Sequence, residues 1–238
     1  MPSHDHWRAL PGVLAALRQA GLETFVVDDG SAAPAAAALA ALAGPGVRVL
    51  RHAARRGKGA AIATGFAAAA EAGFAQALQI DADGQHDVAA LPRLLAAAGA
   101  RPEALIVGHP RYDASAPAGR RIGRLVSRFW VAVETLSPAM PDSLCGLRVY
   151  PLAATRPLLA RVPPGMAFDT AILVRLVWSG VSIVRVPVAV RYPAENFSNF
   201  NMLSDNVAIS RMHAALMLEW PRHLPRLLAR RPRVVREE

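Results

Sequence analysis

Residues 77–86 read Ala-Leu-Gln-Ile-Asp-Ala-Asp-Gly-Gln-His, and this stretch predicts the fold class. Its apolar part, Ala77–Ile80, has the length of a short buried strand. Helical sequence lies on both sides, at Lys58–Ala72 before it and at Val88–Ala98 after it, where Asp87 is a natural N-cap. A strand between two such helices is typical of α/β domains.

The same alternation runs through the first half of the chain. We predict strands at Glu23–Val27, Val47–Leu50 and Ala104–Val107, and helices at Ala9–Ala20 and Pro34–Leu42. This order predicts a mostly parallel central sheet with helices on both faces. In such sheets ligands bind outside the carboxyl ends of the strands. Polar clusters stand at three of these ends: Asp28-Asp29, Asp81–Gln85 and Gly108–Arg111.

The second half of the chain is less regular but mixes the same elements. We predict helices at Arg120–Leu136, Asp169–Ser179 and Leu203–Trp220, a loop running into a strand at Asp142–Tyr150, and a strand at Val181–Val190. The last stretch, from 221 to 238, is rich in arginine and proline. Because no linker is apparent, the length of 238 residues favours one large domain.

Composition and charge narrow the functional classes. The chain is 53% hydrophobic and 19% charged, which indicates a globular protein rather than a disordered one. Its net charge of +9 predicts attraction to nucleic acid, phosphorylated substrates or an acidic membrane, unless it reflects only a preference for arginine. Cys145 is the only cysteine, so we expect no intrachain disulfide and a reducing compartment.

The sequence predicts neither a membrane span nor secretion. No apolar run reaches the length of a span, and Met1–His6 is polar with no signal-peptide core after it. We therefore expect a cytoplasmic protein that is soluble or bound peripherally at the inner face of the membrane. The helix at Met202–Trp220 and the basic residues from Arg222 to Arg236 would form such a contact. The alternative is a core-packing helix followed by a frayed basic end.

The strongest chemical signal is the pair Asp81 and Asp83. The two carboxylates are separated by one residue at a strand end, and Gly84 eases a turn that would let them converge. Oxygen ligands of this kind suit Mg²⁺ or Mn²⁺ held together with substrate phosphates. Such a metal would neutralise the charge on a diphosphate leaving group. The alternative interpretation is a polar turn between a strand and a helix.

Two further clusters accompany this pair. In Asp28-Asp29-Gly30-Ser31 an acid can accept hydrogen bonds from a base or a ribose, or it can form an Asx-type turn. The stretch Arg55-Arg56-Gly57-Lys58-Gly59 opens a helix, where free N–H groups, the helix dipole and cations favour an anion. It lacks the spacing of a P-loop, and the alternative is a basic, flexible helix start.

Taken together, these motifs resemble glycosyltransferase family 2, in particular its dolichyl-phosphate mannosyltransferase-like branch. Five segments carry the resemblance: Phe25–Ser31, Gly57–Gly65, Gln79–His86, Val107–Tyr112 and Asp142–Tyr150. The resemblance implies an α/β fold of the GT-A type and a nucleotide-diphosphate sugar donor. It also implies a nucleotide-binding half at about 1–110 and an acceptor half at about 111–200, followed by a helix and basic tail at 201–238.

The resemblance also implies roles for single residues. Asp29 would contact the nucleotide base, with Asp28 beside it. Gly57, Lys58, Gly59 and Asp81 would line the site of the nucleotide sugar. Asp81, Asp83 and Gln85 would hold Mg²⁺ or Mn²⁺ and the donor diphosphate, with Asp83 acting in catalysis. Arg111, Arg124 and Arg148 would face the acceptor, which is a polyprenyl phosphate, another lipid or a hydroxyl compound. A nucleic-acid partner is not expected.

Asp169 has two possible roles, which depend on the acceptor. In the resemblance it matches a position where many family members carry an acid. A hydroxyl acceptor needs a general base, and Asp169 is the candidate. A phosphate acceptor is already ionised at neutral pH and needs only cations to position it. In that case Asp169 would be a structural helix cap.

Family 2 members normally have a full buried strand before the turn that Met1–Asp5 match, so we expect most of that strand to be missing here. Other readings of the chain are a sugar-phosphate nucleotidyltransferase, a non-enzymatic nucleic-acid-binding protein and a catalytically inactive relative. The first predicts a glycine-rich loop directly after the first strand, and the second predicts aromatic residues among the basic ones. The sequence shows neither pattern.

Overall fold

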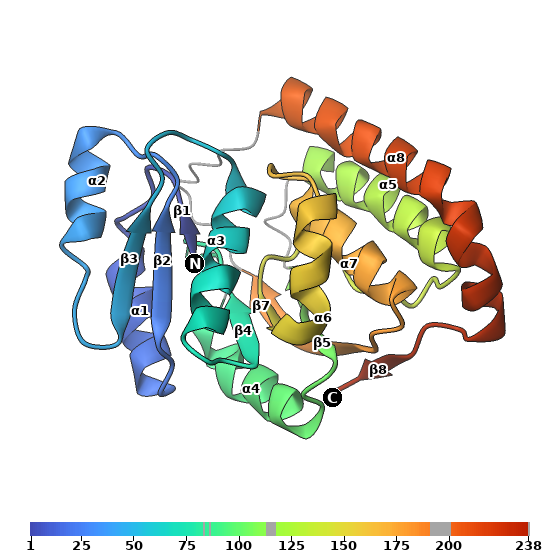
Figure 1. Cartoon of the computed structure of the whole chain (residues 1–238), viewed down its shortest axis with the longest axis horizontal. Coiled ribbons are helices and arrows are strands. Elements are labelled where there is room, and N and C mark those ends of the chain that lie inside the picture. Colours follow the sequence, from blue (N-terminus) through green and yellow to red (C-terminus); the bar gives the residue numbers. More distant parts are fainter. Residues whose placement is uncertain (83, 86, 113–117, 191–200, 238) are drawn as a thin grey trace.

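The structure is a computed structural model, which describes the chain except residues 83, 86, 113–117, 191–200 and 238. The side chains at 111–112, 118–122 and 190 also lie outside the described part. Figure 1 shows strands β1 to β3 and helix α2 at one end of the molecule, and helices α5 and α8 together at the other. The described residues confirm an α/β fold with helices packed on a mostly parallel arrangement of strands.

The first sheet contains three parallel strands in the order β1-β2-β3. Its central strand is buried along its whole length, because the predicted apolar run lies between helices. The strands are β1 Pro2–Ser3, β2 Thr24–Asp28 and β3 Val47–Arg51, and the helices between them are α1 Leu10–Gln19 and α2 Ala33–Ala40. The predicted boundaries differ from these by one or two residues.

The second sheet has five strands in the order β4-β6-β5-β7-β8. Strand β6 is antiparallel to both of its neighbours, whereas β5, β7 and β8 are parallel to one another. The strands are β4 Gln76–Gln79, β5 Leu105–Tyr112, β6 Arg148–Pro151, β7 Ile183–Val190 and β8 Val234–Arg236. The predicted mostly parallel α/β fold is confirmed, with its described strands divided between two sheets. Because β1 has two residues and pairs only with β2, no described strand joins the two sheets.

Helices connect the strands and supply most of the core. After the β1–β3 region the helices are α3 Lys58–Glu71, α4 Leu91–Ala100, α5 Ala118–Thr135, α6 Leu152–Thr155, α7 Phe168–Trp178 and α8 Met202–Ala229, and 3₁₀ turns cover Val88–Ala90 and Arg156–Arg161. Every residue of α7 is buried, so this helix is the centre of the larger core. Asp87 accepts a hydrogen bond from the N–H of Ala89, which confirms the predicted cap.

The C-terminal segment differs from the prediction. Helix α8 does not end at Trp220 but continues through Pro221 and Pro225 to Ala229. Tertiary contacts hold it, since the His223 ring stacks on Trp178 with centroids 4.2 Å apart. The chain then forms β8, which pairs with β7, so the alternative of a frayed basic end is wrong for residues 234–236. Among the described residues, no helix combines the length and apolar character that crossing a bilayer requires.

Candidate active site

A lysine bridges two carboxylates where β4, α3 and α7 meet. The Nζ atom of Lys58 lies 2.9 Å from an Asp81 oxygen and 2.8 Å from Oδ2 of Asp169. Lys58 opens α3, Asp81 follows β4, and Asp169 lies in the first turn of α7. Burial alone would lower the pKa of Lys58, but the two carboxylates outweigh it and raise that pKa above its ordinary value. Lys58 is therefore a fixed cation.

Asp169 is buried, and both of its carboxylate oxygens accept hydrogen bonds. Oδ2 accepts from Lys58, and Oδ1 accepts from Nε2 of Gln79 at 2.9 Å. The N-cap position of α7 is Ala167, and no side chain caps this helix end. The alternative of Asp169 as a helix cap is therefore wrong. The carboxylate instead holds Lys58 in place.

Asp81 depends on a glycine in the loop that precedes β6. A Cβ atom added at Gly146 would lie 2.0 Å from Oδ2 of Asp81, closer than any side chain tolerates. The carboxylate therefore occupies the space that a side chain at position 146 would fill. The side chains of Lys58 and Asp81 are 17% and 21% exposed, whereas that of Asp169 is 4% exposed, so the Lys58–Asp81 end of the bridge faces outward. Gln85 lies half-buried beyond it, and Asp83 lies outside the described residues.

Asp29 organises the loop that leads into α3. Its carboxylate accepts from the N–H groups of Arg56 at 2.8 Å and Gly57 at 2.7 Å, and Nδ1 of His52 lies 2.7 Å from Oδ1. Burial alone would raise the pKa of Asp29, but the hydrogen bond with His52 and the two N–H groups outweigh it and lower the pKa. The prediction of free N–H groups here is wrong for Arg56 and Gly57, because Asp29 binds them.

Asp28 and the two glycines of the loop also have mainly local partners. Asp28 is buried, pairs with Arg51 and accepts from the N–H of Ser31 at 2.8 Å. Gly57 has φ 102°, which other residues rarely adopt. A Cβ at Gly59 would lie 2.7 Å from Cβ of Phe168, so this glycine permits α3 to approach α7. Asp28, Gly57 and Gly59 therefore fix the conformation of the backbone around the site.

The three predicted acceptor arginines are in different situations. Arg148 is fully buried and donates to the carbonyls of Ser143, Cys145 and Asp169 at 2.6 to 2.8 Å. The prediction that Arg148 faces an acceptor is therefore wrong, because its guanidinium holds the backbone around the site. Arg124 on α5 forms an ion pair with Asp142. Arg111 lies in β5, and its side chain is outside the described part.

Three residues that contribute to this geometry had no predicted role. Gln79 positions Asp169, His52 positions Asp29, and Gly146 makes room for Asp81. Gln79 and Gly146 lie inside the segments that carry the family resemblance, which was the available signal. Among the described residues, no group of three or more His, Cys, Asp or Glu side chains is placed to hold a metal ion.

Acidic side chains and a fixed lysine thus stand where the strands of this α/β domain end, which is where such domains bind their ligands. The sequence profile described as Glycosyl transferase family 2 matches residues 1–143. The chain therefore belongs to glycosyltransferase family 2 and is an enzyme of that class. The family match therefore favours a glycosyltransferase over the alternative of a sugar-phosphate nucleotidyltransferase.

Individual relatives agree with this assignment. The chain is 31% identical over 201 residues to an undecaprenyl-phosphate mannosyltransferase of Micrococcus luteus, covering 79% of this chain and 80% of the relative. The fold is also similar to that of glucosyl-3-phosphoglycerate synthase from Mycobacterium tuberculosis, which was crystallised with Mn²⁺, uridine diphosphate and phosphoglyceric acid. The two structures superimpose with a TM-score of 0.69 at 20% sequence identity, and the match covers 92% of this chain and 76% of that one. Mannosyl-3-phosphoglycerate synthase from Rubrobacter xylanophilus superimposes with a TM-score of 0.66 at 18% sequence identity. That match covers 95% of this chain and 74% of the other.

Proposed function

We propose that this enzyme transfers a sugar, with inversion, from a nucleotide-diphosphate sugar to a polyprenyl phosphate or a related lipid phosphate, and that it requires a divalent metal. The observation that carries the proposal is the Lys58 bridge between Asp81 and Asp169 at the strand ends. The Micrococcus luteus relative supports the lipid-phosphate acceptor by its name. The Mn²⁺ and uridine diphosphate in the Mycobacterium tuberculosis crystals support the metal and the donor.

The residues around Asp81 suit a hard divalent cation. With one lysine and two carboxylates, the bridge has a net charge of −1, and the more exposed of its two carboxylates is that of Asp81. Asp81, Asp83 and Gln85 would hold Mg²⁺ or Mn²⁺, since both metals prefer oxygen ligands. The bound metal would neutralise charge on the departing diphosphate. Lys58 reduces the repulsion that two unpaired carboxylates would exert on that diphosphate.

The state of Asp169 favours a phosphate acceptor over a hydroxyl. A general base must offer a lone pair to the acceptor, yet both oxygens of Asp169 already accept hydrogen bonds and one binds an ammonium. A phosphate monoester has a second pKa of about 6, so at neutral pH it attacks without losing a proton to the enzyme. Its oxygen bonds to the anomeric carbon while the nucleoside diphosphate leaves with the electron pair of the broken bond.

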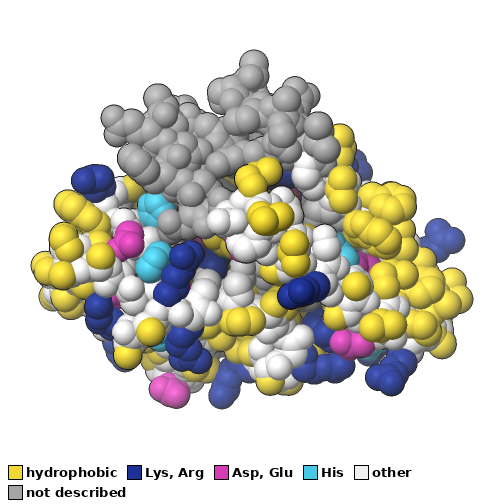
Figure 2. Space-filling model, turned by 90° about the horizontal axis from the view of Figure 1, so that it is seen from above, with side chains coloured by type: hydrophobic (Ala, Val, Ile, Leu, Met, Phe, Trp, Pro, Cys, Tyr) yellow, Lys and Arg dark blue, Asp and Glu magenta, His cyan; other side chains and the backbone are white. Residues whose placement is uncertain are grey.

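An exposed apolar surface on α5 and α8 fits a membrane-bound acceptor. Figure 2 shows hydrophobic side chains gathered over the end of the molecule that α5 and α8 form. The exposed members are Leu125, Val126, Phe129 and Trp130 of α5, and Met202, Leu203 and Val207 of α8. The exposed Arg128 and Arg211 accompany them. We propose that this α5–α8 surface rests on an anionic membrane, since apolar side chains with arginines around them favour that interface.

The membrane proposal is tested by co-sedimentation with vesicles of phosphatidylcholine and phosphatidylglycerol. The double variant Leu125→Ser, Phe129→Ser is expected to lose most of the vesicle-bound fraction. Leu228→Ser removes an exposed leucine at the far end of α8 and serves as the matched control. Equal binding by both variants would contradict the α5–α8 surface as the contact.

The catalytic proposal is tested with nucleotides and metal. UDP or GDP together with Mn²⁺ is expected to raise the melting temperature, and the rise should disappear in Asp81→Asn and Asp83→Ala. Transfer from the preferred nucleotide sugar to undecaprenyl phosphate should then be measurable by thin-layer chromatography. If no nucleoside diphosphate shifts the melting temperature with metal, and DNA or RNA binds strongly and salt-sensitively, the proposal fails.

A further inference from the structure

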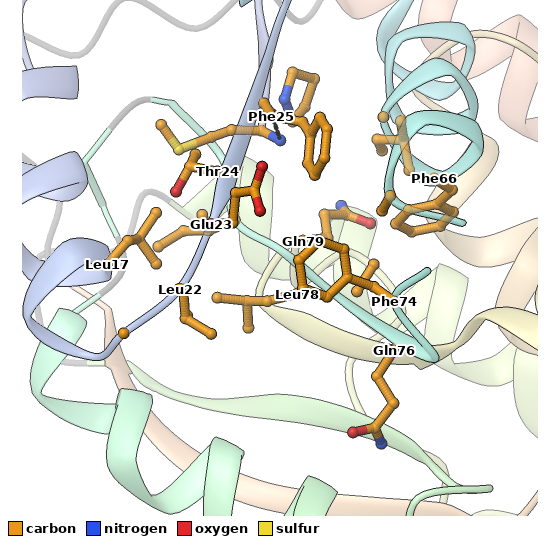
Figure 3. A pocket seen from close by; sticks show the side chains of 18 residues that line it. Leu17, Leu22, Glu23, Thr24, Phe25, Phe66, Phe74, Gln76, Leu78 and Gln79 are labelled. Atoms are coloured by element: carbon orange, nitrogen blue, oxygen red, sulfur yellow. Dashed lines mark hydrogen bonds between the residues drawn. The ribbon is translucent and has the colours of Figure 1, made fainter. Parts of the chain in front are cut away.

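A cavity between the two sheets is lined by residues of β1, β2 and β4 and by the helices beside them. It has a volume of about 140 Å³, and Figure 3 shows mostly apolar side chains around it, among them Leu17, Leu22, Phe66 and Phe74. None of the described residues that line it is a lysine or an arginine. The cavity therefore offers no side-chain cation to an anionic ligand, although the chain has a net charge of +9.

Basic side chains gather instead on the second sheet, on the face where α5 lies. Arg185 of β7 stands between Val184 and Val186, which both pack with α4 in one core cluster. Because side chains alternate along a strand, Arg185 points to the opposite face. There its Nη1 donates to the carbonyl of Ala139, in the loop after α5, at 3.0 Å. Arg236 of β8 is the register partner of Arg185 and therefore lies on the same face.

Two buried N–H donors on this face have no acceptor. Nη2 of Arg185 lies 2.7 Å from Nε2 of His109, which belongs to β5. Since an arginine can only donate, Nε2 accepts, and the proton of the neutral ring is on Nδ1. Among the described residues, neither Nδ1 of His109 nor Nε of Arg185 has a hydrogen-bond partner, although both atoms are buried. Buried donors are nearly always satisfied, so these two indicate a ligand that accepts hydrogen bonds.

The positive charge on this face is not balanced by acids of the chain. Burial lowers the pKa of Arg185 most, and the nearby Arg236 and Arg128 lower it further. Asp142 also lies nearby, but its carboxylate forms an ion pair with Arg124. In the part of the chain that the structure describes, no carboxylate forms an ion pair with Arg128, Arg185 or Arg236. Three arginines with no paired acid favour an anion between them.

We propose that His109, Arg128, Arg185 and Arg236 form a binding site for a phosphate group, separate from the Lys58 bridge. The oxygens of a phosphate are strong acceptors, so one phosphate would satisfy Nδ1 of His109 and Nε of Arg185 and offset the charge of the arginines. Arg128 and Arg236 are exposed and would bind its outer oxygens.

The phosphate group has two possible sources. It belongs either to a soluble compound or to the headgroup of an anionic lipid. The second source follows from the place of Arg128, which lies three residues after the exposed Leu125 and directly before the exposed Phe129 on α5. These two side chains belong to the α5–α8 surface that we propose to rest on the membrane.

Titration with inorganic phosphate, at constant ionic strength and without nucleotide or metal, tests the site. Phosphate should raise the melting temperature. The double variant Arg128→Gln, Arg236→Gln should bind it about tenfold more weakly or worse. Arg230→Gln, Arg231→Gln removes the same charge from two exposed arginines just before β8 and serves as the matched control.

Nuclear magnetic resonance locates the bound phosphate. The ring signals of His109, identified by their absence in His109→Gln, should shift when phosphate is added. The same shift is expected in Asp81→Asn, which lacks a proposed metal ligand. Neither readout depends on transferase activity, so a protein that binds phosphate in this way but transfers no sugar would count against the proposed function alone.

Co-sedimentation with vesicles of phosphatidylcholine and phosphatidylglycerol distinguishes the two sources. For a lipid headgroup, Arg128→Gln, Arg236→Gln should bind the vesicles about fivefold more weakly than the control variant. For a soluble compound, the two double variants should bind the vesicles alike, and only Arg128→Gln, Arg236→Gln should lose affinity for inorganic phosphate. Equal phosphate affinity and equal vesicle binding of the two double variants would overturn the proposal.

Discussion

The Lys58 ammonium and the Asp169 carboxylate lie 2.8 Å apart although 111 residues separate them in the sequence. Lys58 begins the helix after β3, and Asp169 lies in the first turn of the most buried helix of the chain. Their contact joins the two predicted halves of the domain at the strand ends. Since Asp81 binds the same ammonium, one cation fixes two carboxylates.

Replacing Lys58 should therefore harm both stability and catalysis. In Lys58→Met, Asp169 remains buried without its counter-ion, and breaking such a pair costs roughly 3 kcal/mol of unfolding free energy. Transfer activity should fall by about a hundredfold or more, since the same change leaves Asp81 without its fixed cation. Urea denaturation and initial rates measure the two effects. Lys58→Arg keeps the positive charge and should recover most of the stability. An unchanged urea midpoint in Lys58→Met would contradict a stabilising ion pair.

Gly146 offers a narrower test of the Asp81 position. In Gly146→Ala the new Cβ would meet the Asp81 carboxylate at 2.0 Å, so that carboxylate must move. We expect at least tenfold weaker metal activation, seen as a higher Mn²⁺ concentration for half-maximal activity. Gly99→Ala is the matched control, because a Cβ at that exposed position meets nothing within 4 Å. The same Mn²⁺ dependence in both variants would mean that Asp81 does not hold the metal.

The sequence predicted the α/β class and the first-half elements well because those signals are local. Short apolar runs and flanking caps such as Asp87 define each strand and helix by themselves. The end of α8 could not be predicted in this way. Pro221 and Pro225 indicate a helix end locally, but contacts such as the stacking of His223 on Trp178 keep the helix intact.

The site residues were predictable as a group but not in their individual tasks. The acids at the strand ends were found because topology brings such ends together. Which donor satisfies each acid depends on tertiary structure, and Asp29 turns inward to bind N–H groups of Arg56 and Gly57. Arg148 shows the same limit, since an arginine in sequence gives no indication that its guanidinium is fully buried.

Folding stability should depend on pH through His109. Burial and, second, the neighbouring Arg185 lower the pKa of this histidine below its ordinary value near 6.5. The unfolded chain then binds more protons than the folded chain just below pH 6.5, so this contribution to stability is lost as pH falls through that range. Arg185 donates to Nε2 of His109 at 2.7 Å, which requires an unprotonated nitrogen there.

Melting curves between pH 7.5 and 5.5 measure this effect. The unmodified protein should lose more thermal stability over that interval than His109→Gln, whose side-chain oxygen still accepts from Arg185 and does not titrate. The difference between the two slopes isolates His109 from His223, whose pKa is also lowered mainly by burial. Parallel curves would show that His109 does not change its protonation on unfolding.

Substitution of Arg148 tests whether this residue stabilises the fold or binds the acceptor. Its guanidinium donates to three main-chain carbonyls, around Ser143, Cys145 and Asp169. In Arg148→Met at least two of these carbonyls should lose their donor, and each unsatisfied buried group costs about 1–3 kcal/mol. The melting temperature should therefore fall strongly. Acceptor binding is then compared at a temperature where both variants stay folded. Relative to the unmodified protein, the KM for a lipid-phosphate acceptor should change less in Arg148→Met than in Arg124→Met. A large and selective increase in acceptor KM for Arg148→Met, with an unchanged melting temperature, would instead restore Arg148 to the acceptor site.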